Sequence, residues 1–425
     1  MSTPTLSTVS TDVCVDVGPA RCLTCRECGA EYPLAARYAC DECFGPLEVS
    51  YDFQGVTRAS IEAGPANMWR YAGLLPVPSD VDGGKNLQPG FTHLIKADNL
   101  AAVLGMRALW VKDDSGNPTH SFKDRVVAVA MENARRLGFT TVACASTGNL
   151  ANAVAAAAAR AGLRSCVVIP HDLEDGKTVT TAVYGGTLVA VEGNYDDVNR
   201  LCSEVAGDDE WGFVNVNLRP YYAEGSKTLG YEVAEQLGWR LPQQVVVPIA
   251  SGSLMTKIDK SFTEFIKLGL VEASEYRIFG AQATGCSPVS AAWKDGADFV
   301  KPQRPNTIAK SLAIGNPADG PYALDVAKRT GGAIEDVSDD EVVEGIRLLA
   351  QTEGIFGETA GGVTVATLRK LLAAGAIDPD AETVILNTGD GLKTLEAVAD
   401  SVGPSATIPP SLDAFRVAIQ EAGLS

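Results

Sequence analysis

The chain has 425 residues and lacks any apolar run long enough to cross a membrane, for which about 18 residues are needed. Its first 20 residues have neither a basic start nor an apolar block, so they do not resemble a secretory signal. It also lacks internal repeats and, apart from an alanine-rich stretch at 151–161, low-complexity tracts. We therefore expect a cytoplasmic protein with no membrane partner.

The chain also has few basic residues relative to acidic ones: 35 Lys and Arg against 53 Asp and Glu. The formal net charge is −18 and the pI is about 4.7, which disfavours nucleic acid and anionic membranes as partners. Any anionic ligand must therefore be captured by local groups, against the field of the whole protein. The hydrophobic content of 46% and charged content of 21% are ordinary for a globular enzyme. The length predicts two large lobes with an accessory piece.

Cysteine is sparse except near the N-terminus. Cys25-x2-Cys28 and Cys40-x2-Cys43 form two closely spaced pairs that are separated by eleven residues. Four thiolates in this arrangement can surround a tetrahedral zinc ion, and residues 32–34 and 46–51 resemble short strands of a zinc ribbon. Four cysteines leave no open coordination position, so such a zinc would be structural. The alternative is a set of reduced thiols without metal, since disulfides are disfavoured in the cytoplasm.

From residue 92 onward, predicted strands and helices alternate along the chain. Alternation at this spacing predicts parallel sheets joined by right-handed crossovers. The predicted strands are 92–96, 108–112, 141–145, 165–170, 187–191, 212–217, 245–249, 278–283 and 383–387. The predicted helices are 99–104, 126–137, 149–161, 177–184, 195–206, 339–353 and 361–374.

The most informative stretch is Gly-Asn-Pro-Thr-His-Ser-Phe-Lys-Asp-Arg at 116–125. It places Lys123 at the first turn of a helix, near the positive end of the helix dipole. A lysine at this end is easier to deprotonate, and a Schiff base with an aldehyde cofactor requires a neutral amine. The alternative interpretation is an ordinary surface lysine at a loop–helix junction.

Three further motifs fall where a predicted strand passes into a helix or turn, at 146–149, 250–253 and 388–391. In open parallel sheets, ligands bind beyond the carboxyl ends of the strands, where helix N-termini point. Each motif taken alone is also compatible with a simple turn or helix cap. Together with Lys123 they supply what pyridoxal phosphate requires: an imine-forming lysine, a phosphate site, and partners for the ring hydroxyl and ring nitrogen.

The motifs Gly-Asn-Pro-Thr-x-Ser-Phe-Lys-Asp-Arg, Ala-Ser-Thr-Gly-Asn and Asn-Thr-Gly-Asp-Gly-Leu-Lys resemble those of fold-type-II pyridoxal-phosphate enzymes, and most of all the threonine synthase family. The resemblance covers about residues 85–400. It implies a tryptophan-synthase-β-like α/β fold with two three-layer α/β/α lobes, whose open sheets are mostly parallel. The implied units are a zinc-ribbon-like module at 1–52, a large cofactor-binding domain at 53–115 and 219–425, and a small mobile domain at 116–218.

The resemblance also assigns cofactor contacts. Lys123 would form the Schiff base with pyridoxal 5′-phosphate, Asn149 would bond its ring hydroxyl, and Thr388 would face its ring nitrogen. The cofactor's phosphate would lie against Ala250, Ser251, Gly252 and Ser253.

The implied reaction converts O-phospho-L-homoserine and water to L-threonine and phosphate, the last step of threonine biosynthesis, and the family implies a homodimer. The freed amine of Lys123 would move the substrate's protons. Ser146 and Thr147 would receive the substrate's α-carboxylate. Further substrate contacts would come from Ser121, Lys177, Asn215 and Arg219, with Lys227 and Lys310 as additional candidate cations.

The sequence departs from the family pattern at several positions. Leu150 stands where a threonine is frequent, His93 where proline is frequent, and Ala250 and Ser251 stand at positions that glycine and asparagine often hold. Two other classes of function therefore stay open at this point. One is another lyase of the same fold, such as cysteate synthase or a threonine or serine dehydratase. The other is a non-catalytic relative that uses the zinc ribbon for binding.

Overall fold

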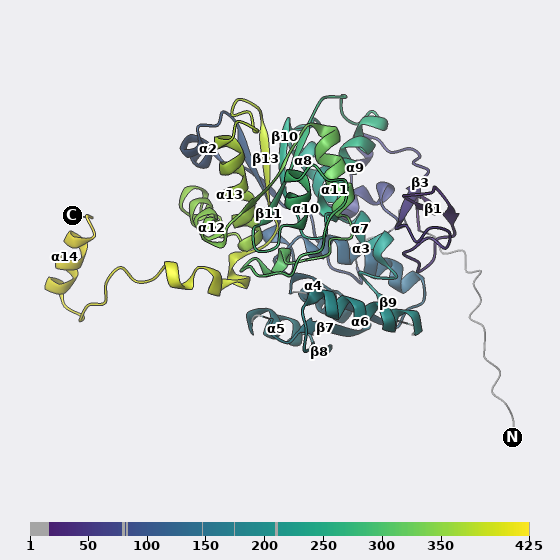
Figure 1. Ribbon diagram of the computed structural model, residues 1–425, viewed down its shortest axis with the longest axis horizontal. Helices are drawn as coiled ribbons and strands as arrows, with labels where there is room; N and C mark the ends of the chain where they lie inside the picture. The colour runs from purple at the N-terminus through teal and green to yellow at the C-terminus, as the bar shows by residue number, and fades with distance from the viewer. Residues whose placement is uncertain are drawn as a thin grey trace, which may run out of the picture.

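A computed structural model describes residues 17–78, 81, 84–146, 148–173, 175–208 and 211–424. Thr147, one of the predicted substrate contacts, lies outside the described residues. Three sheets organise the described chain: a small one near the N-terminus, one of six strands, and one of four strands (Figure 1).

The small sheet is antiparallel, with the strand order β2-β1-β3. The predicted ribbon strands appear in it as β2 and β3, whereas its central strand, β1, was not predicted. The bounds are β1 (Ala20–Cys25), β2 (Glu31–Tyr32) and β3 (Leu47–Tyr51). Both cysteine pairs lie at the end of this sheet, where the turns after β1 and before β3 meet.

The six-stranded sheet has the order β12-β11-β10-β13-β5-β4. Only β4 runs antiparallel to its neighbour. Its central strand, Gln-Val-Val-Val-Pro, is buried throughout, as expected for a parallel strand that is covered on both faces. The bounds are β4 (His93–Lys96), β5 (Leu109–Asp113), β10 (Gln244–Pro248), β11 (Arg277–Ala283), β12 (Ile334–Val337) and β13 (Thr383–Asn387).

Helices cover both faces of this sheet. Alternate residues of β10 point to opposite sides: Val245 and Val247 pack into one core, and Val246 packs into the other. The first core is formed with α1 (Arg58–Glu62), α8 (Lys227–Gln236), α9 (Ser253–Lys267), α10 (Pro288–Lys294) and α11 (Gly320–Thr330). The second is formed with α2 (Asp98–Leu104), α12 (Asp339–Glu353) and α13 (Thr359–Ala373).

The four-stranded sheet is parallel throughout, with the order β8-β7-β6-β9. Val142 and Cys144 of β6 pack against α3 and α4, whereas Ala143 and Ala145 face α6. The strands are β6 (Thr141–Ala145), β7 (Arg164–Pro170), β8 (Thr187–Val191) and β9 (Gly212–Phe213). The associated helices are α3 (Lys123–Arg136), α4 (Asn149–Ala161), α5 (Asp175–Ala182), α6 (Tyr195–Asp208) and α7 (Arg219–Glu224).

Two predicted elements need correction. The helix expected at 126–137 begins at Lys123, one turn earlier. The strand expected at 212–217 ends at Phe213, because the chain turns back there: the N–H groups of Val216 and Leu218 both donate to the Phe213 carbonyl at 3.1 Å. This turn, rather than a strand, places the side chains of 215–219.

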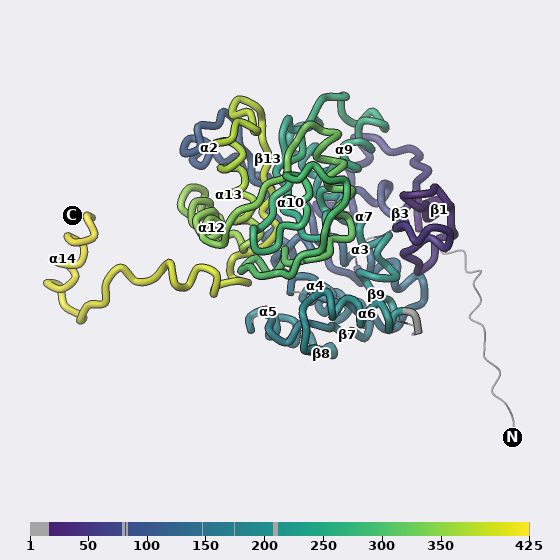
Figure 2. The backbone as a smooth tube through the Cα atoms, viewed as in Figure 1, coloured from purple at the N-terminus to yellow at the C-terminus, as the bar shows by residue number. Residues whose placement is uncertain are grey.

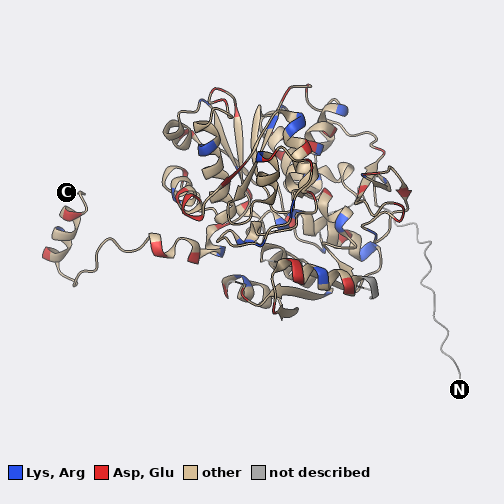
Figure 3. Cartoon of the chain, viewed as in Figure 1, with Lys and Arg blue, Asp and Glu red and all other residues tan. Residues whose placement is uncertain are grey.

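None of the described helices is long and apolar enough to cross a membrane. Basic and acidic residues are interspersed on the helices that surround the sheets (Figure 3). The chain after Ser401 leaves the body and ends in α14 (Leu412–Glu421), which buries none of its residues (Figure 2). Short 3₁₀ helices lie at Met68–Leu74, Asp114–Gly116, Lys310–Leu312, Gly391–Lys393, Leu395–Ala397 and Ala399–Ser401.

Candidate active site and cysteine cluster

A cavity of about 280 Å³ lies where the carboxyl ends of β6 and β10 face each other. A smaller, adjoining cavity reaches the end of β13 and shares several residues with the first, Lys123 and Asn149 among them. Predicted site residues that line one cavity or both are Lys123, Ser146, Asn149, Asn215, Arg219, Ala250, Ser251, Gly252, Ser253 and Thr388. Chain segments that are far apart in sequence therefore meet around one lysine.

Lys123 is the first residue of α3, and its amine faces the cavity. The surrounding protein excludes water from the amine, and this desolvation lowers the pKa of Lys123 to about 8, while the Glu358 carboxylate acts in the opposite direction. The amine lies 4.3 Å from the centroid of the Phe122 ring. Among the described residues, none forms a hydrogen bond or ion pair with it. The amine is thus readily neutralised, which a Schiff base requires.

Arg125, two residues further along the helix, anchors α3 from behind. Its guanidinium donates to both carboxylate oxygens of Asp114, at 2.7 and 2.8 Å, and to Glu232 at 2.5 and 2.8 Å. Lys112 adds a 2.7 Å bond to Glu232, and all four of these side chains are completely buried. This cluster joins the first turn of α3 to β5 and α8 and so fixes the position of Lys123. Arg125 belongs to the lysine motif, but its role was not predicted from the sequence.

Residues 250–253, the predicted phosphate site, connect β10 to α9. Gly252 has a φ of +95°, and a Cβ there would lie 2.6 Å from the Asp319 carbonyl oxygen, so only glycine fits. The first turn of α9 has no acidic residue and no side-chain cap, which leaves backbone N–H groups free for an anion. The positive end of this 15-residue helix adds to the attraction. The arrangement fits a cofactor phosphate.

Asn149 contacts Glu358, and both residues line the smaller cavity. The Asn149 amide donates to the two carboxylate oxygens at 2.8 and 3.0 Å, and its own Oδ1 is buried without a partner. An orphaned amide oxygen beside the lysine fits a hydrogen-bonding ring substituent. Glu358 directly precedes Thr359-Ala360-Gly361-Gly362, a stretch whose resemblance to the family predicts a place beside the cofactor, but Glu358 itself was not predicted as a site residue.

Thr388 follows β13 and lines the smaller cavity together with Lys123. Its carbonyl accepts a 3.0 Å hydrogen bond from the N–H of Phe122. This bond ties the end of β13 to the residue before the lysine, so the threonine and the lysine keep a fixed relation across the cavity.

The predicted substrate contacts separate into two groups. Ser146, Asn215 and Arg219 lie in the wall of the larger cavity. The Ser146 hydroxyl accepts from the N–H groups of Gly148 and Ala151 at 3.0 and 2.8 Å, so its own proton stays available to a ligand. Asn215 Nδ2 donates to the Ala145 carbonyl at 3.2 Å.

The second group lies outside the described walls of both cavities. Ser121 is fully buried, with a hydroxyl that has no partner. Lys177 is fully buried and packs against the backbone of Gly148, where a Cβ would lie 2.2 Å from Lys177 Cδ. The candidate cation Lys227 is also fully buried and bonded to Glu264. Their contact with substrate stays a prediction.

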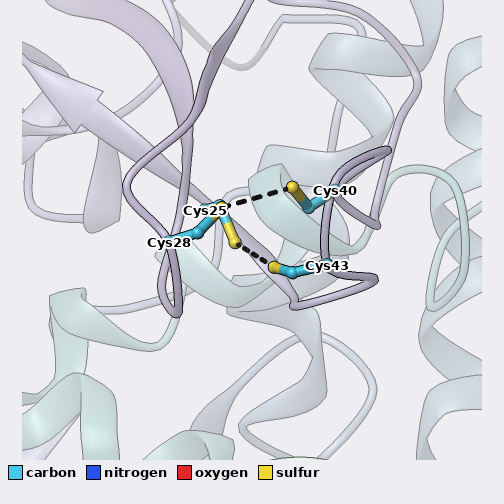
Figure 4. Close-up of side chains that lie close together, drawn as sticks. All are labelled: Cys25, Cys28, Cys40 and Cys43. Atoms are coloured by element: carbon cyan, nitrogen blue, oxygen red, sulfur yellow. Dashed lines mark hydrogen bonds between the residues drawn. The ribbon is translucent and has the colours of Figure 1, made fainter.

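The four cysteines predicted as metal ligands come together at the end of the small sheet (Figure 4). Their sulfur atoms all lie within 4.8 Å of one another, with 3.4 Å between Cys25 and Cys43 and 3.6 Å between Cys28 and Cys40. A tetrahedral zinc with bonds of about 2.3 Å to sulfur requires sulfur atoms about 3.8 Å apart, so the cluster fits zinc. The Tyr32 hydroxyl, 3.1 Å from Cys40, lowers the pKa of that thiol to about 6.

Comparison with known proteins agrees with this geometry. The sequence profile of the family described as "Pyridoxal-phosphate dependent enzyme" matches residues 85–389. A threonine synthase of Methanosarcina acetivorans is 37% identical over 402 residues, covering 93% of this chain and 98% of that protein. A threonine synthase of Methanocaldococcus jannaschii is 37% identical over 88% of this chain and 93% of its own length. The chain therefore belongs to the pyridoxal-phosphate-dependent enzyme family and, within it, to the threonine synthase family.

Solved structures of low sequence identity share the fold. Diaminopropionate ammonia lyase from Escherichia coli has a TM-score of 0.63 at 19% identity, over 82% of this chain and 93% of that one. Threonine deaminase isoform 2 from Solanum lycopersicum has a TM-score of 0.60 at 20% identity, over 73% of this chain and 88% of that one. The predicted fold class and the predicted cofactor, pyridoxal phosphate, are confirmed.

Proposed function

We propose that this enzyme converts O-phospho-L-homoserine and water to L-threonine and phosphate. The observation that carries the proposal is the pairing of two anion-binding regions around Lys123. One is the turn at 250–253, which suits the cofactor's phosphate, and the other is the wall with Asn215 and Arg219, which suits a second phosphate. The threonine synthase relatives support the same assignment.

In this proposal pyridoxal phosphate supplies an electron sink that makes C–H bonds next to the substrate's amino carbon acidic. Lys123 would hold the cofactor through its amine. Once released, the amine would take a proton from the substrate's Cα, give it up, and then take one from Cβ before phosphate leaves from Cγ. Water then adds at Cβ, and protons are returned at Cγ and Cα. The low pKa of Lys123 favours the neutral amine that this work requires. Asn149 bonds the ring hydroxyl, and Thr388 offers the ring nitrogen a neutral hydroxyl instead of a carboxylate.

The substrate is oriented by the opposite wall. Ser146, with Thr147 beside it in sequence, receives the α-carboxylate at the N-terminus of α4. Arg219 and Asn215 receive the phosphate that leaves from Cγ. We assign Lys177, which is buried against Gly148, to the support of this wall, and Ser121, which is bridged to Gly389, to the support of the turn after β13.

Turnover of three substrate sets tests the proposal against the other lyases of this fold. We expect O-phosphohomoserine to be converted to threonine and phosphate. Threonine alone, and phosphoserine with sulfite, should be turned over much more slowly or not at all. Lys123→Ala, purified in parallel, should lose both the visible absorbance of the bound cofactor and activity. Turnover of threonine or serine alone would overturn the proposal in favour of a dehydratase, and cysteate formation would favour cysteate synthase. A protein that binds zinc but turns over none of these substrates would favour the non-catalytic alternative.

We also propose that the three sheets mark three units: 1–52, then 53–115 with 219–425, and 116–218 as a small domain that closes over substrate. Each unit contains one complete sheet, which supports these boundaries. We propose a cytoplasmic homodimer without nucleic-acid or membrane partners, by the family resemblance and the acidic composition. Light scattering tests the oligomer, and superimposable ligand-free and ligand-bound structures would contradict the closure.

A further inference from the structure

The first cysteine turn of the small sheet contacts the wall of the active-site cavity. Arg26 and Glu27 lie between Cys25 and Cys28. The Arg26 guanidinium stacks 3.6 Å from the centroid of the Tyr322 ring, and the Tyr322 hydroxyl donates a hydrogen bond to Glu27. The two residues that separate a pair of metal ligands are therefore both attached to α11 of the large sheet's helix layer.

Asp319, immediately before α11, connects this turn to the cavity. One carboxylate oxygen lies 3.7 Å from Arg26 Nη1, and the other accepts a 2.7 Å bond from Arg219. The Asp319 N–H donates to the Ser251 carbonyl at 2.8 Å, and its carbonyl lies against Gly252. Asp319 thus touches the cysteine turn, the predicted substrate cation and the phosphate-binding turn at once.

Three further contacts join the cysteine-rich module to the large domain near the same site. Tyr38, between the two cysteine pairs, lines the larger cavity directly. Glu48 of β3 forms an ion pair with Lys257 of α9. Lys257 lies one turn after the first residue of this helix, and the N-terminus of the helix faces the predicted site of the cofactor phosphate. The Tyr51 hydroxyl donates to Glu224 at 2.6 Å. The module is therefore part of the active-site wall as well as a separate sheet.

We propose that Arg26 is a positioning residue for substrate binding and that occupancy of the cysteine site by zinc is linked to binding of the substrate's phosphate. Zinc fixes the turn that carries Arg26. Arg26 then shares Asp319 with Arg219, which partly neutralises the carboxylate that would otherwise repel a phosphate dianion and hold Arg219 in a closed pair. The inference rests on the proposed function, because it requires a phosphate at Arg219.

Linkage makes the proposal testable in both directions, because a metal that strengthens phosphate binding must itself be retained more strongly when phosphate is bound. The experiment uses the enzyme loaded with pyridoxal phosphate, so that the turn at 250–253 is filled, and inorganic phosphate as the probe. The equilibrium release of zinc to a competing chromogenic chelator is measured with and without phosphate. We expect phosphate to raise the apparent zinc affinity of the wild type several-fold, and Arg26→Gln to abolish this effect.

Kinetics supply the second readout. Arg26→Gln should raise KM for O-phosphohomoserine about tenfold, while kcat and the cofactor's absorbance change less than twofold. Arg26→Lys should restore part of the loss, since it keeps the charge. Arg21→Gln is the matched control: Arg21 lies on β1, the strand that leads into the turn with Arg26, and pairs with the exposed Glu31 at 2.6 Å. It should behave as wild type.

The inference is wrong if phosphate leaves zinc release from the wild type unchanged, if Arg21→Gln and Arg26→Gln have equal effects, or if kcat falls while KM stays constant. Its failure can be told apart from failure of the proposed function. Turnover of O-phosphohomoserine without linkage overturns the inference alone. Linkage without such turnover overturns the proposed substrate and leaves a phosphate site coupled to the metal.

Discussion

Arg125 and Arg219 lie on opposite sides of the catalytic lysine and illustrate two uses of a buried guanidinium. Arg125 has no exposed surface and is bonded to Asp114 and Glu232, which are equally buried. Arg219 is 24% exposed, faces the cavity, and pairs with Asp319. A guanidinium whose donors are occupied by fixed partners holds the backbone. A guanidinium with N–H donors that face a cavity can bind a ligand there.

The largest effect is expected from Arg125→Met, which leaves two buried carboxylates without their main partner. Breaking a buried ion pair in this way costs about 3–5 kcal/mol in the free energy of unfolding. Urea denaturation monitored by circular dichroism measures the loss. Arg135→Met on the same helix is the control, because Arg135 is partly exposed and its partner Glu132 would keep the ion pair with Arg136, so the loss should stay below about 1 kcal/mol. Equal losses for the two variants would contradict the assigned role of the Arg125 cluster.

A smaller effect, with a definite pH dependence, is expected from Lys123→Met in the cofactor-free protein. The folded-state pKa of Lys123 is about 8, below the ordinary value of 10.5, so the unfolded chain binds more protons between these two values. The stability of the wild type should therefore rise as the pH increases from 8 to 10.5. The variant lacks this titration and should be more stable by roughly 2–3 kcal/mol at pH 7, a gain that shrinks by pH 10. Melting temperatures at the two pH values measure it, and a gain that is equal at both would contradict the shifted pKa.

The smallest effect on folding, and a clear one on binding, is expected from Arg219→Gln. Asp319 would keep Arg26 nearby, so the free energy of unfolding should change by less than about 1 kcal/mol. Loss of a charged hydrogen bond to phosphate costs about 2 kcal/mol, which should raise KM for O-phosphohomoserine ten- to thirtyfold. Arg200→Gln, on the exposed face of α6, should leave KM unchanged. A fall in kcat with an unaltered KM would show that Arg219 acts in some other way.

Much of the site was predictable because its signals are local. The turn at 250–253 needs glycine for its backbone conformation, and the cysteine spacing sets the metal ligands. Asp319 and Tyr38 were missed because nothing in their own sequence neighbourhood distinguishes them from ordinary residues, and Glu358 was missed although the stretch that follows it, 359–362, resembles the family. They acquire their position only through partners elsewhere in the chain.

Several elements were also missed, for a different reason. Most of α8, from Lys227 to Ala234, is buried on all sides, so the sequence has no alternation of polar and apolar faces to reveal a helix there. Its polar residues are satisfied by distant charges: Lys227 bonds to Glu264, and Glu232 bonds to Arg125. In sequence this pattern resembles a mixed surface segment.

Backbone preferences and spacings of a few residues set the alternation of strands and helices, the lysine at a helix start, the glycine turn and the cysteine pairs, so these features follow from the chain alone. The contact of Asn149 with Glu358, 209 residues away, and that of Arg219 with Asp319, 100 residues away, arise only in the folded molecule. Hydrogen bonds and charge interactions depend on distance in space, and separation along the chain gives no measure of that distance.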